Sequence, residues 1–273
     1  CSLLIPFLRN GRNFGRLMKL HTLSKIYLAL ILTFLYVPIA VMILLSFNSS
    51  KFYRLPIDWT FKWYELLFEN QQLIDASINS ILIAFITTIL ATTIGTCAAL
   101  AFFRHSFRGK NFLLLLLFPP IAIPWLIIGT SMLVFFFWIG IGRGLFALIL
   151  GHVALAIPYV IIVVGARLKS FDKALEESAR SLGATSFQTF WYVTFPFLFP
   201  GFLAASLFVF AISLDQFVIS YFLATPDSRT LPVEIYTAIR KGFTPEINAI
   251  STIIILVSMS LLLIVSRYHK FEK

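Results

Sequence analysis

The polar residues that could do chemistry are few and lie within strongly apolar sequence. Asp215, followed by Gln216, falls in the hydrophobic stretch 197–223. A carboxylate inside a membrane span costs about 2.5–3.5 kcal/mol on insertion scales unless it faces protein, water or a cation. Asp215 is therefore a candidate binding group for a cationic solute. A hydrogen bond to a neighbouring helix, or a contact with a partner subunit, would equally account for it.

Helical geometry separates the two polar neighbours. At about 100° per residue, Ser213, Gln216 and Ser220 share one arc of a helix, and Asp215 points away from it. Asp215 and Gln216 therefore cannot both face a thin pore, and we expect one of them to contact a partner subunit.

A second candidate site is a proline cluster in the stretch 112–138. Pro119, Pro120 and Pro124 are expected to break a helix there, and Trp125 follows them. Broken helices expose backbone carbonyls, which can accept hydrogen bonds from ammonium groups. Trp125, next to the predicted break, is therefore a candidate residue of the solute pathway. The alternative is a packing kink that binds no ligand. His152 is expected to be hydrogen-bonded within the protein rather than to bind a ligand.

Several classes of function are disfavoured. The sequence has no Gly-x-x-x-x-Gly-Lys-Ser/Thr motif, so it is not expected to hold ATP by that route. An intramembrane enzyme would need a constellation of catalytic groups, whereas Asp215, His152 and Cys97 fall on different predicted spans without a motif. A stand-alone ion-coupled carrier would be expected to carry several intramembrane charges or an inverted repeat. We predict a transport protein with no bond chemistry, no cofactor and no metal of its own.

Composition indicates an all-α membrane protein. Hydrophobic residues make up 59% of the chain and charged residues 12%, about half the charged fraction of soluble domains. Mean hydropathy is +0.91. The net charge of +10 is distributed in short segments beside the apolar runs, which is typical of a topology signal in lipid and not of a nucleic-acid surface.

Hydropathy predicts six transmembrane helices within one domain, 26–267. Each is longer than the ~20 residues that cross a bilayer. Residues 1–25 are predicted to be an N-terminal segment and 268–273 a short tail. The predicted spans are 26–47, 75–103, 112–138, 146–168, 197–223 and 248–267.

The basic residues predict the orientation. Fifteen of the 22 Lys and Arg residues fall in the terminal segments and in the loops after the second and fourth spans. Because positive charge is retained on the cytoplasmic side, both termini and the loop 169–196 are predicted to be cytoplasmic.

The loop 169–196 reads as two short helices joined by a glycine turn. Leu168, Phe171, Leu175, Ala179 and Leu182 recur at helical spacing and predict one apolar stripe. Ser170 or Asp172 is expected to cap the first helix and Ser186 the second. Gly183 is expected to end the first helix, because glycine enters the left-handed conformation without a steric cost. Pro196 is expected to open the next span.

This loop resembles the EAA loop of ABC-importer permeases. Glu177, Ala179 and Gly183 match that motif, and Val193-Thr194-Phe195-Pro196 matches its tail. Ser178 replaces the usual second alanine, and Phe195 the usual leucine. The resemblance implies a type I importer fold with a coupling helix that docks on a separate ATPase. ATP and Mg would be bound by that ATPase.

Other segments are similar to the spermidine/putrescine importer permeases, and most of all to the second permease of that system. They include Phe47-Asn48-Ser49-Ser50, Phe107-Arg108-Gly109-Lys110, Ser213–Ser220 and Pro245–Ala249. The family commonly has two adjacent acids where this chain has Asp215 and Gln216. The resemblance implies polyamine import across a bacterial inner membrane with a second permease, two ATPases and an external binding protein. Another solute, such as an amino acid, iron or another cation, is the alternative.

Overall fold

The computed structural model describes the backbone of residues 11–50, 56–117, 119–242 and 245–269, and side chains from Ser24 onward except at 258 and 261–269. These residues are almost entirely helical, with no strand beyond one isolated bridge between Asn48 and Trp59. The α-helices are α1 (Gly11–Leu45), α2 (Lys62–Glu69), α3 (Gln71–Arg104), α4 (Lys110–Leu115), α5 (Pro119–Ala122), α6 (Trp125–Trp138), α7 (Leu145–Lys169), α8 (Ala174–Ser181), α9 (Ser186–Thr189), α10 (Phe195–Leu214), α11 (Val218–Leu223), α12 (Leu231–Lys241) and α13 (Pro245–His269). A π-helical segment η2 (Phe190–Thr194) and a 3₁₀ turn η3 (Pro226–Ser228) complete the description.

The chain divides into two compact units. The first consists of residues 1–69 and 242–273, and within it α13 packs against α1 and α2. Trp63 of α2 is 2% exposed and donates its indole N–H to the Asn48 carbonyl at 2.7 Å. This bond fixes α2 beside the end of α1.

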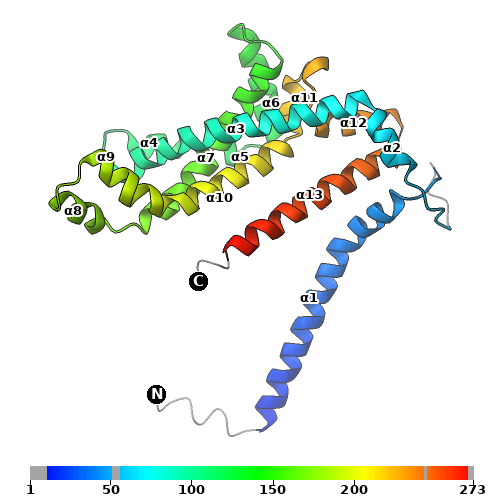
Figure 1. The fold of residues 1–273 in the computed structure, drawn as a ribbon, viewed down its shortest axis with the longest axis horizontal. Helices are drawn as coiled ribbons and strands as arrows, with labels where there is room; N and C mark the ends of the chain where they lie inside the picture. Colours follow the sequence, from blue (N-terminus) through cyan, green and yellow to red (C-terminus); the bar gives the residue numbers. More distant parts are fainter. Residues whose placement is uncertain (1–10, 51–55, 118, 243–244, 270–273) are drawn as a thin grey trace. The chain divides into compact units, whose positions relative to one another are not determined.

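The second unit, residues 70–241, is built around three long helices, α3, α7 and α10, which pack side by side (Figure 1). Their contact is a dry cluster of small and branched side chains that includes Ala91, Ala156, Val160, Val164 and Val209. Such side chains allow close helix approach where lipid supplies no hydrophobic drive for association. All candidate site residues lie in this unit.

Four helices are long and apolar enough to cross a membrane, namely 24–45 of α1, α3, α7 and the continuous helix 186–214. The predicted third span is broken, because residues 110–122 and 125–138 meet at 109°. If that bent pair forms one span, the number of candidate spans is five. Among the described residues, the apolar part of α13 is 245–257, which is shorter than these spans. The prediction of a proline break is confirmed, since Pro124 stands immediately before α6.

The predicted fifth span, 197–223, is wrong as a continuous helix. It ends at Leu214, and α11 starts only at Val218. Hydropathy cannot detect this interruption because every residue on both sides of it is compatible with lipid. The predicted terminal segments, 1–25 and 268–273, include residues 1–10 and 270–273, which lie outside the described residues, so those boundaries stay predictions.

Candidate functional site

The first helix of the loop 169–196 is shorter than the sequence pattern suggests. α7 continues to Lys169, and α8 begins at Ala174 with Lys173, and neither Ser170 nor Asp172, at its N-cap position. Asp172 accepts the Ala174 N–H at 2.9 Å. The predicted single stripe is therefore wrong. Leu168 is buried in α7, whereas Leu175 of α8 is 51% exposed.

Gly183 ends α8 as predicted. Its φ is +91°, and its N–H donates to the Arg180 carbonyl at 2.9 Å. The Ala184 N–H donates to the carbonyl of Ala179 at 3.1 Å. This pair of bonds is the Schellman arrangement, which satisfies the last carbonyls of a helix. Two of the motif residues, Ala179 and Gly183, thus act together in the turn.

The second helix of the loop is not separate from the span that follows. Thr185, and not the predicted Ser186, caps it in a reciprocal arrangement with Gln188. The helix then runs without a break from Ser186 to Leu214, with one π-helical turn at 190–194. Pro196 is the second residue of α10, directly after the π turn. Because the helix already starts at Ser186, Pro196 does not open the span as predicted.

The loop exposes a group of large apolar side chains. Leu182 is 90% exposed, Tyr192 79% and Phe187 73%. Leu175 and Trp191 add further exposed apolar surface. Isolated exposed apolar residues are common, but a rigid protrusion carrying several of them is typical of an interaction surface.

Glu176 and Glu177 are neighbours on α8 with opposite environments. Glu177, the motif residue, is exposed. The Glu176 side chain is 13% exposed, and its Oε1 accepts from Arg104 Nη2 at 2.5 Å and from the Thr194 hydroxyl. Burial raises the pKa of Glu176, but the hydrogen bonds from Thr194 and Arg104 and the charges of Arg104 and Arg180 outweigh it, so the pKa lies below its ordinary value.

Sequence reasoning missed the role of Glu176. The signal in the sequence was the pair of adjacent glutamates on a short helix. Neighbouring residues of a helix point about 100° apart, so one of the two can face inward while the other faces outward. The partners, Arg104 and Thr194, are distant in sequence and were not predictable from spacing.

The interruption of the predicted fifth span holds the second group of candidate residues. Asp215 follows the last residue of α10, its N–H donates to Ala211 at 3.2 Å, and its side chain is exposed. Gln216 is 3% exposed. The expectation that Asp215 and Gln216 face different ways is confirmed, although Asp215 stands at a helix end and not inside a continuous span.

His152 joins the two sides of this interruption. Its Nδ1 lies 2.8 Å from the Ser213 Oγ of α10, and its Nε2 lies 3.0 Å from the Ser220 Oγ of α11. All three side chains are buried, at 2%, 5% and 0% exposure. The expectation that His152 is hydrogen-bonded is confirmed. Gln216 Oε1, by contrast, is buried without a hydrogen-bond partner among the described residues.

α11 is held by backbone contacts as well. The Gly144 N–H donates to the Leu223 carbonyl at 2.8 Å, and Arg143 donates to the Ala224 carbonyl. At Gly151 a Cβ would come within 2.9 Å of the Leu223 side chain, so α7 and α11 approach closely. These contacts fix α11 as a short helix beside α7.

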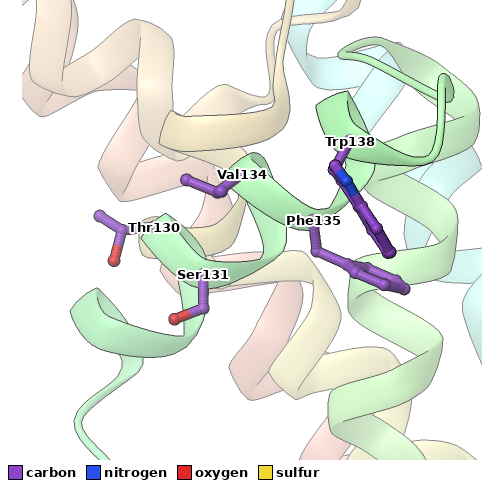
Figure 2. A pocket seen from close by; sticks show the side chains of 5 residues that line it. All are labelled: Thr130, Ser131, Val134, Phe135 and Trp138. Atoms are coloured by element: carbon purple, nitrogen blue, oxygen red, sulfur yellow. The ribbon is translucent and has the colours of Figure 1, made fainter.

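Trp125 is the first residue of α6, and α6 packs on α11. The side chain of Trp125 is partly buried. Figure 2 shows a shallow hollow of about 470 Å³ on another part of α6, where the side chains of Phe135 and Trp138 lie next to each other. Its five lining residues, Thr130, Ser131, Val134, Phe135 and Trp138, all come from α6, so Trp125 and Asp215 do not line it.

The described residues contain no group of three or more His, Cys, Asp or Glu side chains that could hold a metal ion. Cys97, expected inside a span, lies in α3 with its side chain exposed. Two polar clusters bear on the candidate site residues: the Glu176 cluster, made of Arg104, Glu176 and Thr194, and the His152 cluster, made of His152, Ser213 and Ser220.

Comparison with known proteins agrees with this architecture. Residues 91–271 match the family described as binding-protein-dependent transport system inner membrane component. The spermidine/putrescine transport system permease protein PotC of Escherichia coli (strain K12) is 36% identical over 248 residues, covering 90% of this chain and 91% of PotC. The putrescine transport system permease protein PotI of the same organism is 35% identical over 230 residues and covers 82% of each chain.

Solved structures show the same fold at low identity. A bacterial alginate ABC transporter, in complex with a periplasmic protein bound to an alginate pentasaccharide, has a chain with TM-score 0.71 at 20% identity, covering 94% of this chain and 95% of that one. A chain of the MetNI methionine ABC transporter has TM-score 0.58 at 18% identity and covers 71% and 92%. This protein therefore belongs to the family of binding-protein-dependent transport system inner membrane components and is a permease subunit with the type I ABC-importer fold.

Proposed function

We propose that the chain is one of two permease subunits of an ATP-driven importer that moves polyamines across a bacterial inner membrane. A homologous permease, two ATP-binding subunits and an external solute-binding protein complete the assembly. ATP and Mg are bound by the ATPase subunits. The observation that supports polyamines as the solute is the 36% identity to PotC, which extends over 90% of the chain.

The loop 169–196 is the proposed contact with the ATPase. Its exposed apolar side chains, Leu182, Phe187 and Tyr192 among them, favour docking into a groove of another protein. The Schellman turn at Gly183 fixes the angle between α8 and the helix that continues into α10. Rigid docking is required if nucleotide-driven closure of the ATPases is to move the spans. Glu177, Ala179, Gly183 and Pro196 are the proposed coupling residues.

The charge distribution supports a cytoplasmic position for this loop. The loop and the segments on its predicted side carry most of the basic residues of the chain. Positive-inside topology then puts both termini on the cytoplasmic side as well. This orientation gives the loop access to a cytoplasmic ATPase.

The interruption between α10 and α11 is the proposed substrate-pathway element. Asp215 offers an exposed carboxylate, and Gln216 Oε1 is a buried acceptor to which no described residue donates. A polyamine carries several ammonium groups, each a donor and a positive charge, so both groups fit it chemically. Trp125, at the start of α6, is the proposed aromatic contact, since cations bind favourably over an indole ring. Anionic solutes fit this arrangement poorly.

Uptake by cells that lack and then regain this subunit tests the proposal. Labelled spermidine or putrescine should enter only when the chain and its partner subunits are present. Excess unlabelled spermidine should compete, whereas excess arginine, an amino acid whose carboxylate reduces its net charge to +1, should not. Uptake of arginine or iron in place of polyamine would keep the importer class and overturn the solute. No ATP-dependent uptake of any solute by the assembled complex would overturn the importer itself.

A further inference from the structure

The helix α8 has little buried surface that could hold it to the rest of its unit. Six of its eight residues are exposed, and only Glu176 and Ala179 are partly covered. No residue of α8 is fully buried, so packing contributes little to its position. The helix is joined to the chain by turns at both ends, and by the polar contacts of one side chain.

That side chain is Glu176, and its partners come from two different long helices. Arg104 is the last residue of α3, and Thr194 is the residue before α10, fully buried in the π turn. Arg104 Nη2 also lies 3.4 Å from Thr194 Oγ1, so the three side chains form a closed triangle. Arg104 is in addition placed over the Phe171 ring at 5.4 Å, which limits its freedom to leave.

The chemistry of this triangle is suited to transmitting movement. A carboxylate that accepts from a guanidinium and a hydroxyl forms charge-assisted bonds, which are shorter and stronger than neutral ones. The arginine side chain is 23% exposed, so water screens the ion pair only partly. Loss of one partner leaves the other charge partly buried and unpaired, which makes the contact cooperative.

We propose that Glu176 is a positioning residue that ties α8 to α3 and α10 through Arg104 and Thr194, so that a displacement of α8 moves both spans together. The inference rests on the proposed docking of the loop on an ATPase. Within that function it assigns different roles to two neighbours: Glu177 faces outward to the partner, and Glu176 transmits the movement inward.

The test measures three quantities on the reconstituted complex with its own partner subunits. They are the amount of ATPase subunit that co-purifies with the permease, the rate of ATP hydrolysis in the presence of binding protein, and the amount of solute moved per ATP hydrolysed. For Glu176→Gln and Arg104→Gln we expect retained ATPase and continuing hydrolysis, with solute moved per ATP reduced roughly fivefold or more. The double variant should be no worse than either single one, because each removes the same interaction.

Three further variants separate transmission from folding. Arg108→Gln also removes one positive charge, from an exposed side chain four residues after Arg104 and outside the loop 169–196, and it should leave transport per ATP unchanged. Thr194→Ser keeps the hydroxyl and should retain coupling, whereas Thr194→Val removes it and should lower coupling less than Glu176→Gln does.

Three results would overturn the inference. One is loss of the ATPase from the Glu176→Gln complex, which would make Glu176 a docking residue. Another is unchanged transport per ATP, and the third is an equal loss in Arg108→Gln. If the wild-type complex shows no hydrolysis stimulated by binding protein, the proposed function fails and the inference with it.

Discussion

Two pairs of adjacent polar residues flank the helix 186–214, one on α8 before it and one directly after it. They differ in whether the buried member has hydrogen-bond partners. In the loop, Glu176 turns inward and finds Arg104 and Thr194, while Glu177 faces out. At the interruption, Gln216 turns inward and its Oε1 has no partner among the described residues, while Asp215 is exposed.

The difference is informative because buried polar atoms in native proteins are nearly always paired. Glu176 has its partners within the subunit, which fits a permanent attachment. Gln216 Oε1, in the interruption between α10 and α11, is a buried acceptor that no group among the described residues satisfies. We infer that the loop is complete within this chain, and that the interruption is completed from outside it, by a donor on the solute or on the second permease.

The largest expected effect comes from breaking the loop. Gly183→Pro removes the N–H bonded to Arg180 and forces φ to about −65°, where the native value is positive. We expect uptake to be lost while the protein still inserts in the membrane, as measured by uptake and by membrane fractionation. Full uptake by this variant would contradict docking through the loop.

A milder matched pair refines that result. Gly183→Ala and Gly140→Ala both place a side chain at positive φ, +91° and +82°, with nothing within 4 Å of the new Cβ. Each should cost about 1–2 kcal/mol of backbone strain. Only the Gly183 variant should lower transport per ATP, because Gly140 lies in the turn between α6 and α7. Equal effects would mean that strain, and not the loop, is being measured.

The next largest effect concerns the charge at the interruption. Asp215→Asn should keep assembly with the ATPase but raise the apparent KM for polyamine uptake about tenfold or more, since the charge-assisted contact becomes neutral. The exchange Asp215→Gln with Gln216→Asp should not restore uptake, because position 216 is buried and position 215 is exposed. Recovery by the exchanged pair would show that only the charge count matters.

The sequence predicted the elements whose signals are local. Gly183 as a helix end and the proline break before Trp125 follow from backbone rules, and both are present. The all-helical class follows from composition. Of the two short helices predicted for the loop 169–196, the first is present as α8, whereas the second is continuous with the span that ends at Leu214.

What the sequence did not predict depends on tertiary hydrogen bonds. The interruption after Leu214 coincides with bonds from His152 of another helix to Ser213 and Ser220, and hydropathy contains no trace of them. The inward role of Glu176 likewise depends on Arg104, distant in sequence. The N-cap of the helix that begins at Ser186 is Thr185, one residue before the predicted cap. Both residues carry a hydroxyl that can cap a helix, so the sequence alone does not distinguish them.

A smaller effect is expected from the His152 cluster. Ser220→Ala leaves one imidazole nitrogen buried without its partner and should destabilise the protein by about 1–3 kcal/mol. Ser206→Ala is the matched control, because the Ser206 hydroxyl donates to the Phe202 carbonyl of its own helix. Denaturant unfolding of the purified protein in detergent measures both. Equal stabilities of the two variants would show that His152 does not hold the interruption together.

The smallest expected effect is the response of the Glu176 cluster to pH. The pKa of Glu176 is lowered from its ordinary value of 4.5, so the carboxylate binds fewer protons in the folded protein than in the unfolded one. Its contribution to stability is therefore fully present above pH 4.5 and is lost as the pH falls through the lowered pKa.

The difference in unfolding stability between wild type and Glu176→Gln should accordingly stay constant between about pH 5 and 8 and shrink only in more acidic solution. Transport per ATP should show the same plateau. A difference that shrinks on acidification from about pH 7 to 6 would place the pKa of Glu176 above its ordinary value. The carboxylate would then be partly protonated under physiological conditions, and a permanent ionic link between α8, α3 and α10 would be untenable.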